Sequence, residues 1–376
     1  MPLEHIQSAQ DARLHASRRL PAMIFDFIDG AAGEERAVRR NLQALSDLNL
    51  MPRVLVNVED RITERSLLGR TWGLPFGIAP MGMCALSWPR ADEAMADVAK
   101  TFNIPHCLST AASMSIERCA ELAGDNVWFQ LYLTDETIGM ALVDRALAAG
   151  VTHLILTVDT PLISKRRREL RRGFKVPFKI GPKQLFDFAT HPRWSIATLM
   201  AGAPKFGNND PTKAKGGQAF DRSKSRGGVD FEFLKRLREK WPHRLIVKGI
   251  LNPDDAFAIK ACGVDAIYVS NHGGRQLDSA PAAISMLPGI RGAVGPGYPL
   301  IFDSGIRDGE DIVKALALGA DFVMVGRPYL YAAGAAGSQG VVHLTELIQQ
   351  ELHAALAQIG RRDVNELDGS VFALTS

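Results

Sequence analysis

The sequence predicts an α/β protein built as a TIM (β/α)₈ barrel. From about residue 75 onward, eight short β-rich runs alternate with helical patterns. Most of these runs are almost continuously apolar, as parallel strands are when helices cover both faces of the sheet. The chain has 376 residues, and a barrel needs only about 250, so there is room for insertions.

The predicted strands cover residues 75–80, 105–110, 127–132, 153–159, 245–250, 266–270, 300–305 and 322–326. Helical patterns lie between most of them, at 91–102, 116–122, 136–149, 230–240, 253–261 and 310–318. Asn252 is placed to cap one helix, and Gly150, Gly263 and Gly319 each follow a helix and can end it in the left-handed conformation. Eight such units favour a barrel. The alternative, a doubly wound sheet, needs no eighth unit and would be expected to carry a glycine-rich nucleotide-binding motif.

Two segments interrupt this alternation inside what we expect to be a single domain over residues 1–376. Residues 1–74 are predicted to be a helical region that precedes the first strand. Residues 175–229, rich in Gly, Lys, Pro and Asn, are predicted to be a variable loop inserted after the fourth strand. Loops this long are usually functional or disordered.

Charge and cysteine content narrow the function classes. The chain has 44 Lys and Arg against 41 Asp and Glu, a net charge of +3, which gives no reason to expect nucleic-acid binding. Its four cysteines form no CxxC pair, so we expect free thiols in a reducing compartment and no metal site. We find neither a signal peptide nor a run of about 18 apolar residues, and we expect a cytoplasmic protein.

In a TIM barrel the active site lies where the strands end at their carboxyl side. The corresponding positions here are strongly polar although the strands are apolar, which indicates a site. They are Met81, Gly82, Ser109, Gln130, Tyr132, Thr157, Asp159, Lys248, residues 270–275, Asp303, Ser304, Gly305, Arg307, Gly326 and Arg327.

His272, in the string SNHGGRQLD, is a candidate general base. Asp159, at the end of the fourth strand, is a candidate partner for its ring. Arg275 can bind a carboxylate through two parallel hydrogen bonds. Together these residue types are suited to removing a proton from an acidic substrate.

Lys248 lies inside an apolar strand, where a lysine is rare unless it is paired. It could form a Schiff base or stabilise negative charge on a cofactor, and periodicity does not choose between these roles. Near the end of the barrel, Gly305 with Arg307 and Gly326 with Arg327 are typical of the phosphate site that barrels build from their last two loops.

The strings IAPMG, LST, WFQLY, LTVDTP, KGI, VSNHGGRQLD, FDSGIRDGEDIVKALALGAD and VMVGRP occur in order along the chain. This set resembles the FMN-dependent α-hydroxy-acid dehydrogenase and oxidase family, which includes glycolate oxidase, L-lactate dehydrogenase and mandelate dehydrogenase. The resemblance extends from about Leu20 to Gly334.

The resemblance implies an FMN enzyme that oxidises an L-2-hydroxy acid, with His272 as the base paired with Asp159. It implies that Lys248 stabilises reduced flavin and that Tyr132, Arg166 and Arg275 hold the substrate. The residues it implies for FMN are Pro80, Met81, Gly82, Ser109, Gln130, Thr157, Lys248, Ser270, Asp303, Ser304, Gly305, Arg307, Gly326 and Arg327. Whether the base takes the Cα proton, leaving a carbanion, or the hydroxyl proton, with hydride transfer, is open. The other arginines of the run 167–172 are interpreted as a solvated basic loop.

Three positions depart from the family pattern. Phe27 replaces a Tyr whose hydroxyl normally helps to hold the substrate carboxylate, and it either changes substrate preference or only packs in its helix. Gly82 is often Ala in the oxidases, which favours a dehydrogenase. Ala111 and Ala112 stand where plant glycolate oxidase has a bulky Trp, and they leave space for a larger substrate side chain.

The favoured hypothesis is a dehydrogenase that passes electrons to a quinone or another carrier. The alternatives are an oxidase that uses dioxygen, an FMN barrel acting on a substrate other than a hydroxy acid, a Schiff-base isomerase or lyase, and an inactive binding protein. Residues 175–229 could lie on the inner face of a membrane, as an alternative to a lid or a disordered loop. The resemblance also implies a homo-oligomer, a tetramer.

Overall fold

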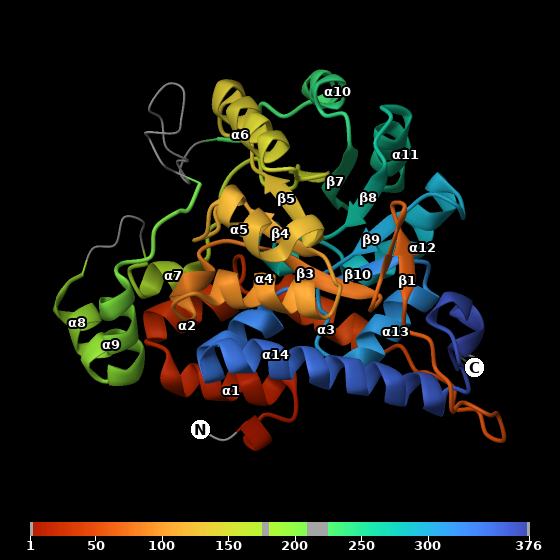
Figure 1. Ribbon diagram of the computed structural model, residues 1–376, viewed down its shortest axis with the longest axis horizontal. Coiled ribbons are helices and arrows are strands. Elements are labelled where there is room, and N and C mark those ends of the chain that lie inside the picture. Colours follow the sequence, from red (N-terminus) through yellow and green to blue (C-terminus); the bar gives the residue numbers. More distant parts are fainter. Residues whose placement is uncertain (1–2, 175–179, 209–224, 374–376) are drawn as a thin grey trace.

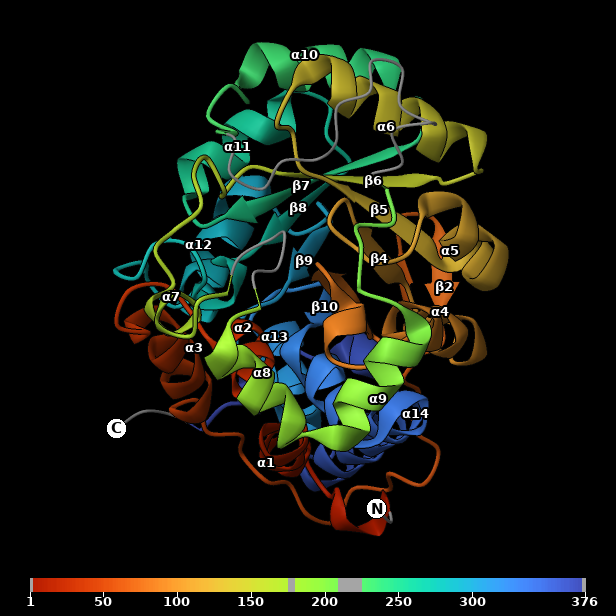
Figure 2. The ribbon, with the colours of Figure 1, turned by 90° about the vertical axis from the view of Figure 1, so that its left-hand side faces the viewer.

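Eight parallel strands close into a barrel in the computed structural model, which describes residues 3–174, 180–208 and 225–373. The strands are β3 (Phe76–Met81), β4 (His106–Ser109), β5 (Val127–Leu131), β6 (His153–Thr157), β7 (Arg244–Ile250), β8 (Ala266–Val269), β9 (Leu300–Phe302) and β10 (Phe322–Val325). Their order around the barrel is the chain order, with β10 pairing back onto β3. The predicted barrel is confirmed, and Figures 1 and 2 show the strands surrounded by helices.

Helices follow the strands as expected. They are α4 (Ala91–Thr101), α5 (Ile116–Ala123), α6 (Glu136–Ala148), α10 (Phe231–Lys240), α11 (Pro253–Ala261), α12 (Ala283–Val294), α13 (Gly309–Ala317) and α14 (Arg327–Gln358). The Asn252 side chain accepts a hydrogen bond from the Asp254 amide at the start of α11. Gly150, Gly263 and Gly319 have φ values of 78°, 73° and 104°, so the predicted caps are confirmed. Neither α12, which contains Pro288, nor α14 is among the helices predicted from the sequence.

The N-terminal region is helical only in part. It contains α1 (Ala9–Arg19), α2 (Ala22–Asp29) and α3 (Arg36–Ser46), but also a hairpin of β1 (Arg65–Leu67) and β2 (Arg70–Trp72). The helical N-terminal region predicted over residues 1–74 is present, and the hairpin within it was not predicted. Leu67 and Trp72 of the hairpin pack with Trp128 and Phe322 inside the barrel. The hairpin therefore fills the amino-terminal end of the barrel with apolar side chains, and the opposite end holds the cavity.

The predicted loop 175–229 contains two helices, α8 (Pro182–Ala189) and α9 (Pro192–Ala201), which correct the loop assignment over these residues. The Trp194 indole N–H donates to the Leu86 carbonyl at 2.8 Å. The Asp187 carboxylate accepts from the Ala22 and Met23 amides at the start of α2. These contacts fix the helical pair to the barrel. Residues 175–179 and 209–224 of the insertion lie outside the described residues.

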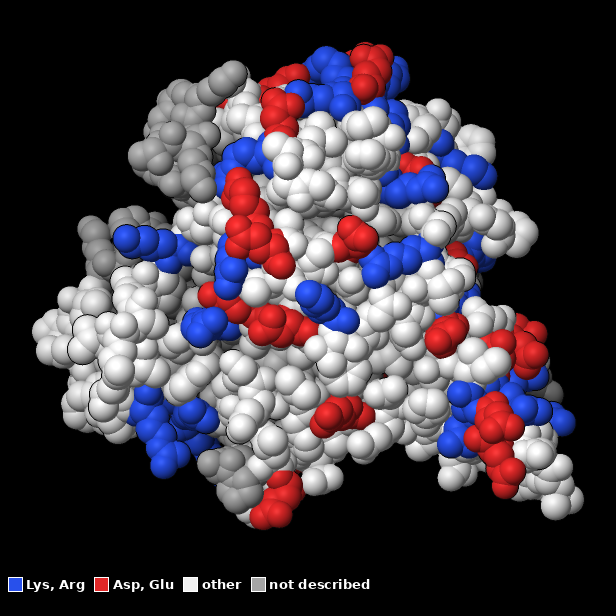
Figure 3. Space-filling model, in the orientation of Figure 1, with Lys and Arg blue, Asp and Glu red and all other residues white. Residues whose placement is uncertain are grey.

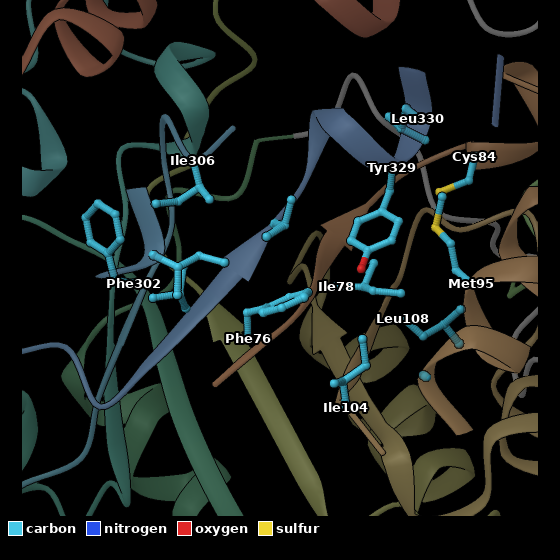
Figure 4. Close-up of a cluster of buried hydrophobic side chains, with 14 of the residues drawn as sticks. Phe76, Ile78, Cys84, Met95, Ile104, Leu108, Phe302, Ile306, Tyr329 and Leu330 are labelled. Atoms are coloured by element: carbon cyan, nitrogen blue, oxygen red, sulfur yellow. The ribbon is translucent and has the colours of Figure 1, made fainter. Parts of the chain in front are cut away.

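Two apolar layers support the barrel. One lies between strands and helices, where Phe76, Ile78, Leu108 and Tyr329 meet (Figure 4). The other fills the barrel interior around Tyr268. Both faces of the strands are therefore buried, which explains why the strands appear in the sequence as apolar runs.

Candidate active site

A cavity opens at the carboxyl ends of the strands and collects most of the polar residues predicted from the sequence. Its predicted lining residues are Phe27, Pro80, Met81, Gly82, Tyr132, Arg166, Lys248, His272, Arg275, Asp303, Ser304, Gly305, Arg307, Gly326 and Arg327. Ser109, Gln130, Thr157, Asp159 and Ser270 are not in its lining. They are instead buried or half-buried around it, and several contact the lining residues directly.

His272 is held between a carboxylate and a phenol. Its Nδ1 lies 3.0 Å from Asp159 Oδ1, and its Nε2 lies 3.1 Å from the Tyr132 hydroxyl. Burial opposes ionisation of Asp159, but the facing His272 ring lowers the pKa of Asp159 overall. An ionised carboxylate only accepts hydrogen bonds, so Nδ1 carries the proton and Nε2 keeps its lone pair. Burial lowers the pKa of His272 against the opposing pull of Asp159, so the ring is neutral near pH 7.

The backbone at His272 is unusual, since its φ of 59° is rare for a side chain other than glycine. Gly273 follows with a φ of 62°. The His272 amide donates to Ser270 Oγ at 3.0 Å, and the Gly273 amide donates to Ser304 Oγ at 3.1 Å. The two serine hydroxyls thus hold the turn that points the imidazole at Asp159.

Lys248 forms a buried network at the floor of the cavity. Its Nζ donates to Ser270 Oγ at 2.6 Å and lies 3.1 Å from Asp303 Oδ2. Ser270 in turn donates to Asp303 Oδ1 at 2.5 Å. Burial opposes the charge on Lys248, yet the Asp303 and Asp159 carboxylates raise the pKa of Lys248 overall. The ammonium is therefore charged, whereas a Schiff-base lysine must be neutral to attack a carbonyl.

Two arginines share a carboxylate that the sequence analysis missed. Glu169 Oε1 accepts from Arg275 Nη2 at 3.0 Å and lies 3.3 Å from Arg166 Nη1. Arg275 also donates to the Gly30 carbonyl at 2.6 Å, which ties it to the end of α2. Glu169 lies inside the basic run 165–172, on the short helix α7 (Arg167–Arg171), where surrounding arginines obscured it.

The interpretation of residues 167–172 as a solvated loop is wrong for Arg168. Its guanidinium is 2.6 Å from Asp26 and 2.8 Å from Asp29, and 28% of its side chain is exposed. These ion pairs connect α7 to α2. They therefore fix the helix that carries Glu169 against the helix that carries Phe27.

Phe27 both packs and lines the cavity. Its ring stacks on Phe174 with centroids 4.4 Å apart, and the Arg275 guanidinium lies 5.6 Å from the ring centroid. Arg275 therefore packs on the ring face, in a cation–π contact. The two readings of Phe27 left open by the sequence are thus compatible.

Arg307 and Arg327 also line the cavity, as the sequence predicted. Arg327 donates to the carbonyls of Gly273 and Gly30 at 2.9 and 3.0 Å. Arg307 Nη1 donates to the Ile306 carbonyl at 2.8 Å. Carbonyl oxygens hold both guanidiniums, and the contacts described for them include no carboxylate ion pair, so they supply positive charge to the cavity.

Gln130 Nε2 and Thr157 Oγ1, both buried beneath the cavity, are among the polar atoms that have no hydrogen-bond partner in the part of the chain that the structure describes. Ser109 donates to the other end of the Gln130 amide at 2.7 Å. Thr157 pairs in register with Lys248. Orphaned polar atoms are costly in a protein interior. Two orphaned polar atoms, one of them beside a charged lysine, fit a flat, polar group with hydrogen-bonding edges, and the two arginines of the cavity lining fit its phosphate, so the residues present fit FMN.

A barrel whose cavity combines a histidine–carboxylate pair, a charged lysine and two arginines fits a flavin-dependent oxidoreductase. In agreement, residues 16–374 match the family model described as FMN-dependent dehydrogenase. The chain therefore belongs to the FMN-dependent dehydrogenase family and is an oxidoreductase.

The relatives are similar over nearly their whole length. The (S)-mandelate dehydrogenase of Pseudomonas putida is 37% identical, over 97% of this chain and 93% of the relative. The L-lactate dehydrogenase of Pseudomonas syringae pv. syringae (strain B728a) is also 37% identical, over 97% and 98%. A crystal structure of the monotopic membrane protein (S)-mandelate dehydrogenase superposes with a TM-score of 0.93 at 36% identity, over 98% and 99% of the two chains.

Proposed function

We propose that this protein oxidises an L-2-hydroxy acid to the 2-oxo acid and passes the electrons to a quinone or another carrier. The observation that carries the proposal is the set of three groups in one cavity: a neutral imidazole with an unprotonated Nε2, a guanidinium three residues later, and a charged lysine. They supply a base, an anchor for the carboxylate and a positive charge for the cofactor.

His272 would take the substrate proton at Nε2, since Nδ1 already donates to Asp159. The positive charge formed on the ring then lies against the Asp159 carboxylate. Tyr132 would hold the substrate oxygen beside Nε2, because its hydroxyl lies 3.1 Å from that atom. A base placed in this way contributes about a hundredfold to ten-thousandfold to the rate.

Arg275 and Arg166 would bind the substrate carboxylate. Glu169 holds both guanidiniums toward the cavity and offsets one of their two charges. A carboxylate entering the cavity therefore meets two guanidiniums that share one carboxylate. This arrangement supports a substrate with a free carboxylate over the alternative of a substrate without one. Phe27 offers an apolar face to the rest of the substrate.

FMN, when bound, accepts the two electrons of the oxidation. Lys248 and Ser270, with Ser109, Gln130 and Thr157, would hold its ring system, and the backbone at Pro80, Met81 and Gly82 would lie against it. Asp303, Ser304, Gly305, Gly326, Arg307 and Arg327 would hold the sugar-alcohol chain and the phosphate. The ammonium of Lys248, kept charged by Asp303, would stabilise negative charge on the cofactor.

We further propose that helices α8 and α9 lie against the inner face of a membrane. On the side facing away from Trp194, Phe186, Leu199 and Met200 are 72%, 83% and 84% exposed. Figure 3 shows this lobe, at the left, with few charges on its outer face and a group of Lys and Arg side chains below it. An apolar surface beside basic groups is typical of proteins that rest on anionic lipid. In the described part of the chain, no helix combines the length and apolar character needed to cross a bilayer.

The test of function is turnover with a panel of L- and D-2-hydroxy acids and an artificial quinone, with the 2-oxo product measured. We expect oxidation of L-acids only, with little hydrogen peroxide, and loss of product with His272→Ala although the protein stays yellow. Peroxide as the main product would instead support the oxidase. Oxidation by His272→Ala at the rate of the unmodified enzyme would refute the assignment of the base. Light scattering of the holoenzyme tests the proposed tetramer.

A further inference from the structure

Arg226 is a buried arginine at the substrate cavity to which the proposed reaction assigns no role. It lies near the end of the insertion 175–229, shortly before α10, and only 9% of it is exposed. Its amide donates to the Pro161 carbonyl at 2.8 Å, which fixes it beside the loop that follows Asp159. Its side chain lines the same cavity as Lys248 and His272.

The Arg226 guanidinium lies close to the reacting centre. Its Cζ is 4.9 Å from the centroid of the Tyr132 ring, a cation–π contact. The hydroxyl of the same tyrosine lies 3.1 Å from His272 Nε2. Only the Tyr132 side chain therefore separates this positive charge from a substrate bound at His272.

Arg226 and Arg275 reach the cavity from different elements. Arg275 packs on Phe27 of α2 and bonds to Glu169 of α7. Arg226 packs instead on Tyr132, which follows β5. A substrate with one carboxylate bound at Arg275 presents no charge to Arg226, whereas one with a second acidic group can meet both. Burial in a medium of low dielectric strengthens such an ion pair.

We propose that Arg226 recognises a second anionic group on the substrate, so that this enzyme prefers 2-hydroxy dicarboxylates over 2-hydroxy monocarboxylates of equal length. The inference rests on the proposed oxidation of 2-hydroxy acids and adds the chemistry of the substrate side chain. Arg226 is thus a specificity-determining residue.

The test compares (S)-2-hydroxyglutarate with (S)-2-hydroxyvalerate, which have the same carbon chain but differ by one carboxylate. We expect kcat/KM to favour the diacid, and Arg226→Gln to lower the diacid-to-monoacid ratio by about tenfold to a hundredfold, mainly through KM. Arg226→Lys keeps the charge and should retain part of the preference. Arg236→Gln on α10 is the matched control, because Arg236 is half exposed and pairs with Glu136 outside the cavity.

Binding of the product analogues 2-oxoglutarate and 2-oxovalerate to the oxidised holoenzyme, followed by flavin absorbance, gives a second readout that needs no turnover. If the unmodified protein binds the diacid more tightly than the monoacid and Arg226→Gln abolishes this difference, the inference is supported. This holds even if no hydroxy acid is oxidised and the proposed function fails. A preference for monoacids overturns it. An equal loss for both acids in Arg226→Gln, with flavin content intact, also overturns it, since Arg226 would then only position Tyr132.

Discussion

Replacing Asp159 with Asn removes the negative charge beside His272 while keeping the shape of the side chain. The two side chains are 12% and 17% exposed, and Asp159 Oδ1 lies 3.0 Å from Nδ1. Charges centred about 4 Å apart attract by about 4 kcal/mol at an effective dielectric constant of 20. This attraction develops only when His272 takes the substrate proton. Its loss should therefore slow substrate oxidation by about a thousandfold.

The same substitution has a definite sign on the pH dependence. Burial lowers the pKa of His272, and Asp159 acts in the opposite direction by favouring the charged ring. In Asp159→Asn the pKa of His272 falls further. The base is then deprotonated down to a lower pH, so the acid limb of kcat/KM moves to lower pH while the maximum falls.

The assay is anaerobic stopped-flow measurement of flavin reduction from about pH 5 to pH 9. Asp144→Asn is the matched control, because that carboxylate is 61% exposed and pairs with Lys240 on the surface. Flavin reduction by Asp159→Asn at the wild-type rate, or an acid limb that moves to higher pH, would refute the role given to this pair.

Three other variants test separate parts of the molecule. Phe27→Tyr adds a hydroxyl at the cavity wall, and we expect the KM for small hydroxy acids to fall by about tenfold or more; an unchanged KM would mean that Phe27 only packs. Lys248→Met leaves the buried Asp303 carboxylate without its ammonium and should lower the free energy of unfolding by about 3–5 kcal/mol, measured with urea; unchanged stability would contradict the ion pair. Leu199→Glu together with Met200→Glu should reduce sedimentation with anionic vesicles, with turnover retained; undiminished sedimentation would remove α9 from the membrane contact.

The barrel could be predicted from the sequence because its strands are buried on both faces, which leaves an apolar run at each. The hairpin β1–β2 carries no such signal. Its strands have three residues each, with Arg, Ser and Thr among them, and only Leu67 and Trp72 point inward. Helix α12 was missed since it contains Pro288, which normally argues against a helix interior.

The candidate site was predictable where residues sit at strand ends, and less so where loops bring them in. His272 and Asp159 follow β8 and β6, so the topology alone places them at one rim. Glu169 and Arg226 come from the long connection between β6 and β7, and no periodicity fixes which of its charges face inward. Their positions depend on contacts between distant parts of the chain, such as the Arg226 amide with Pro161 and Arg275 with Glu169.

The most direct test of the account is the absorbance spectrum of the purified protein, followed without oxygen as single L- and D-2-hydroxy acids are added. We predict flavin bands that an L-acid bleaches, that the matching D-acid leaves unchanged, and that return when a quinone is added. Flavin bands that no hydroxy acid bleaches would contradict the proposed substrate class, and a protein that binds no FMN would contradict the function as a whole.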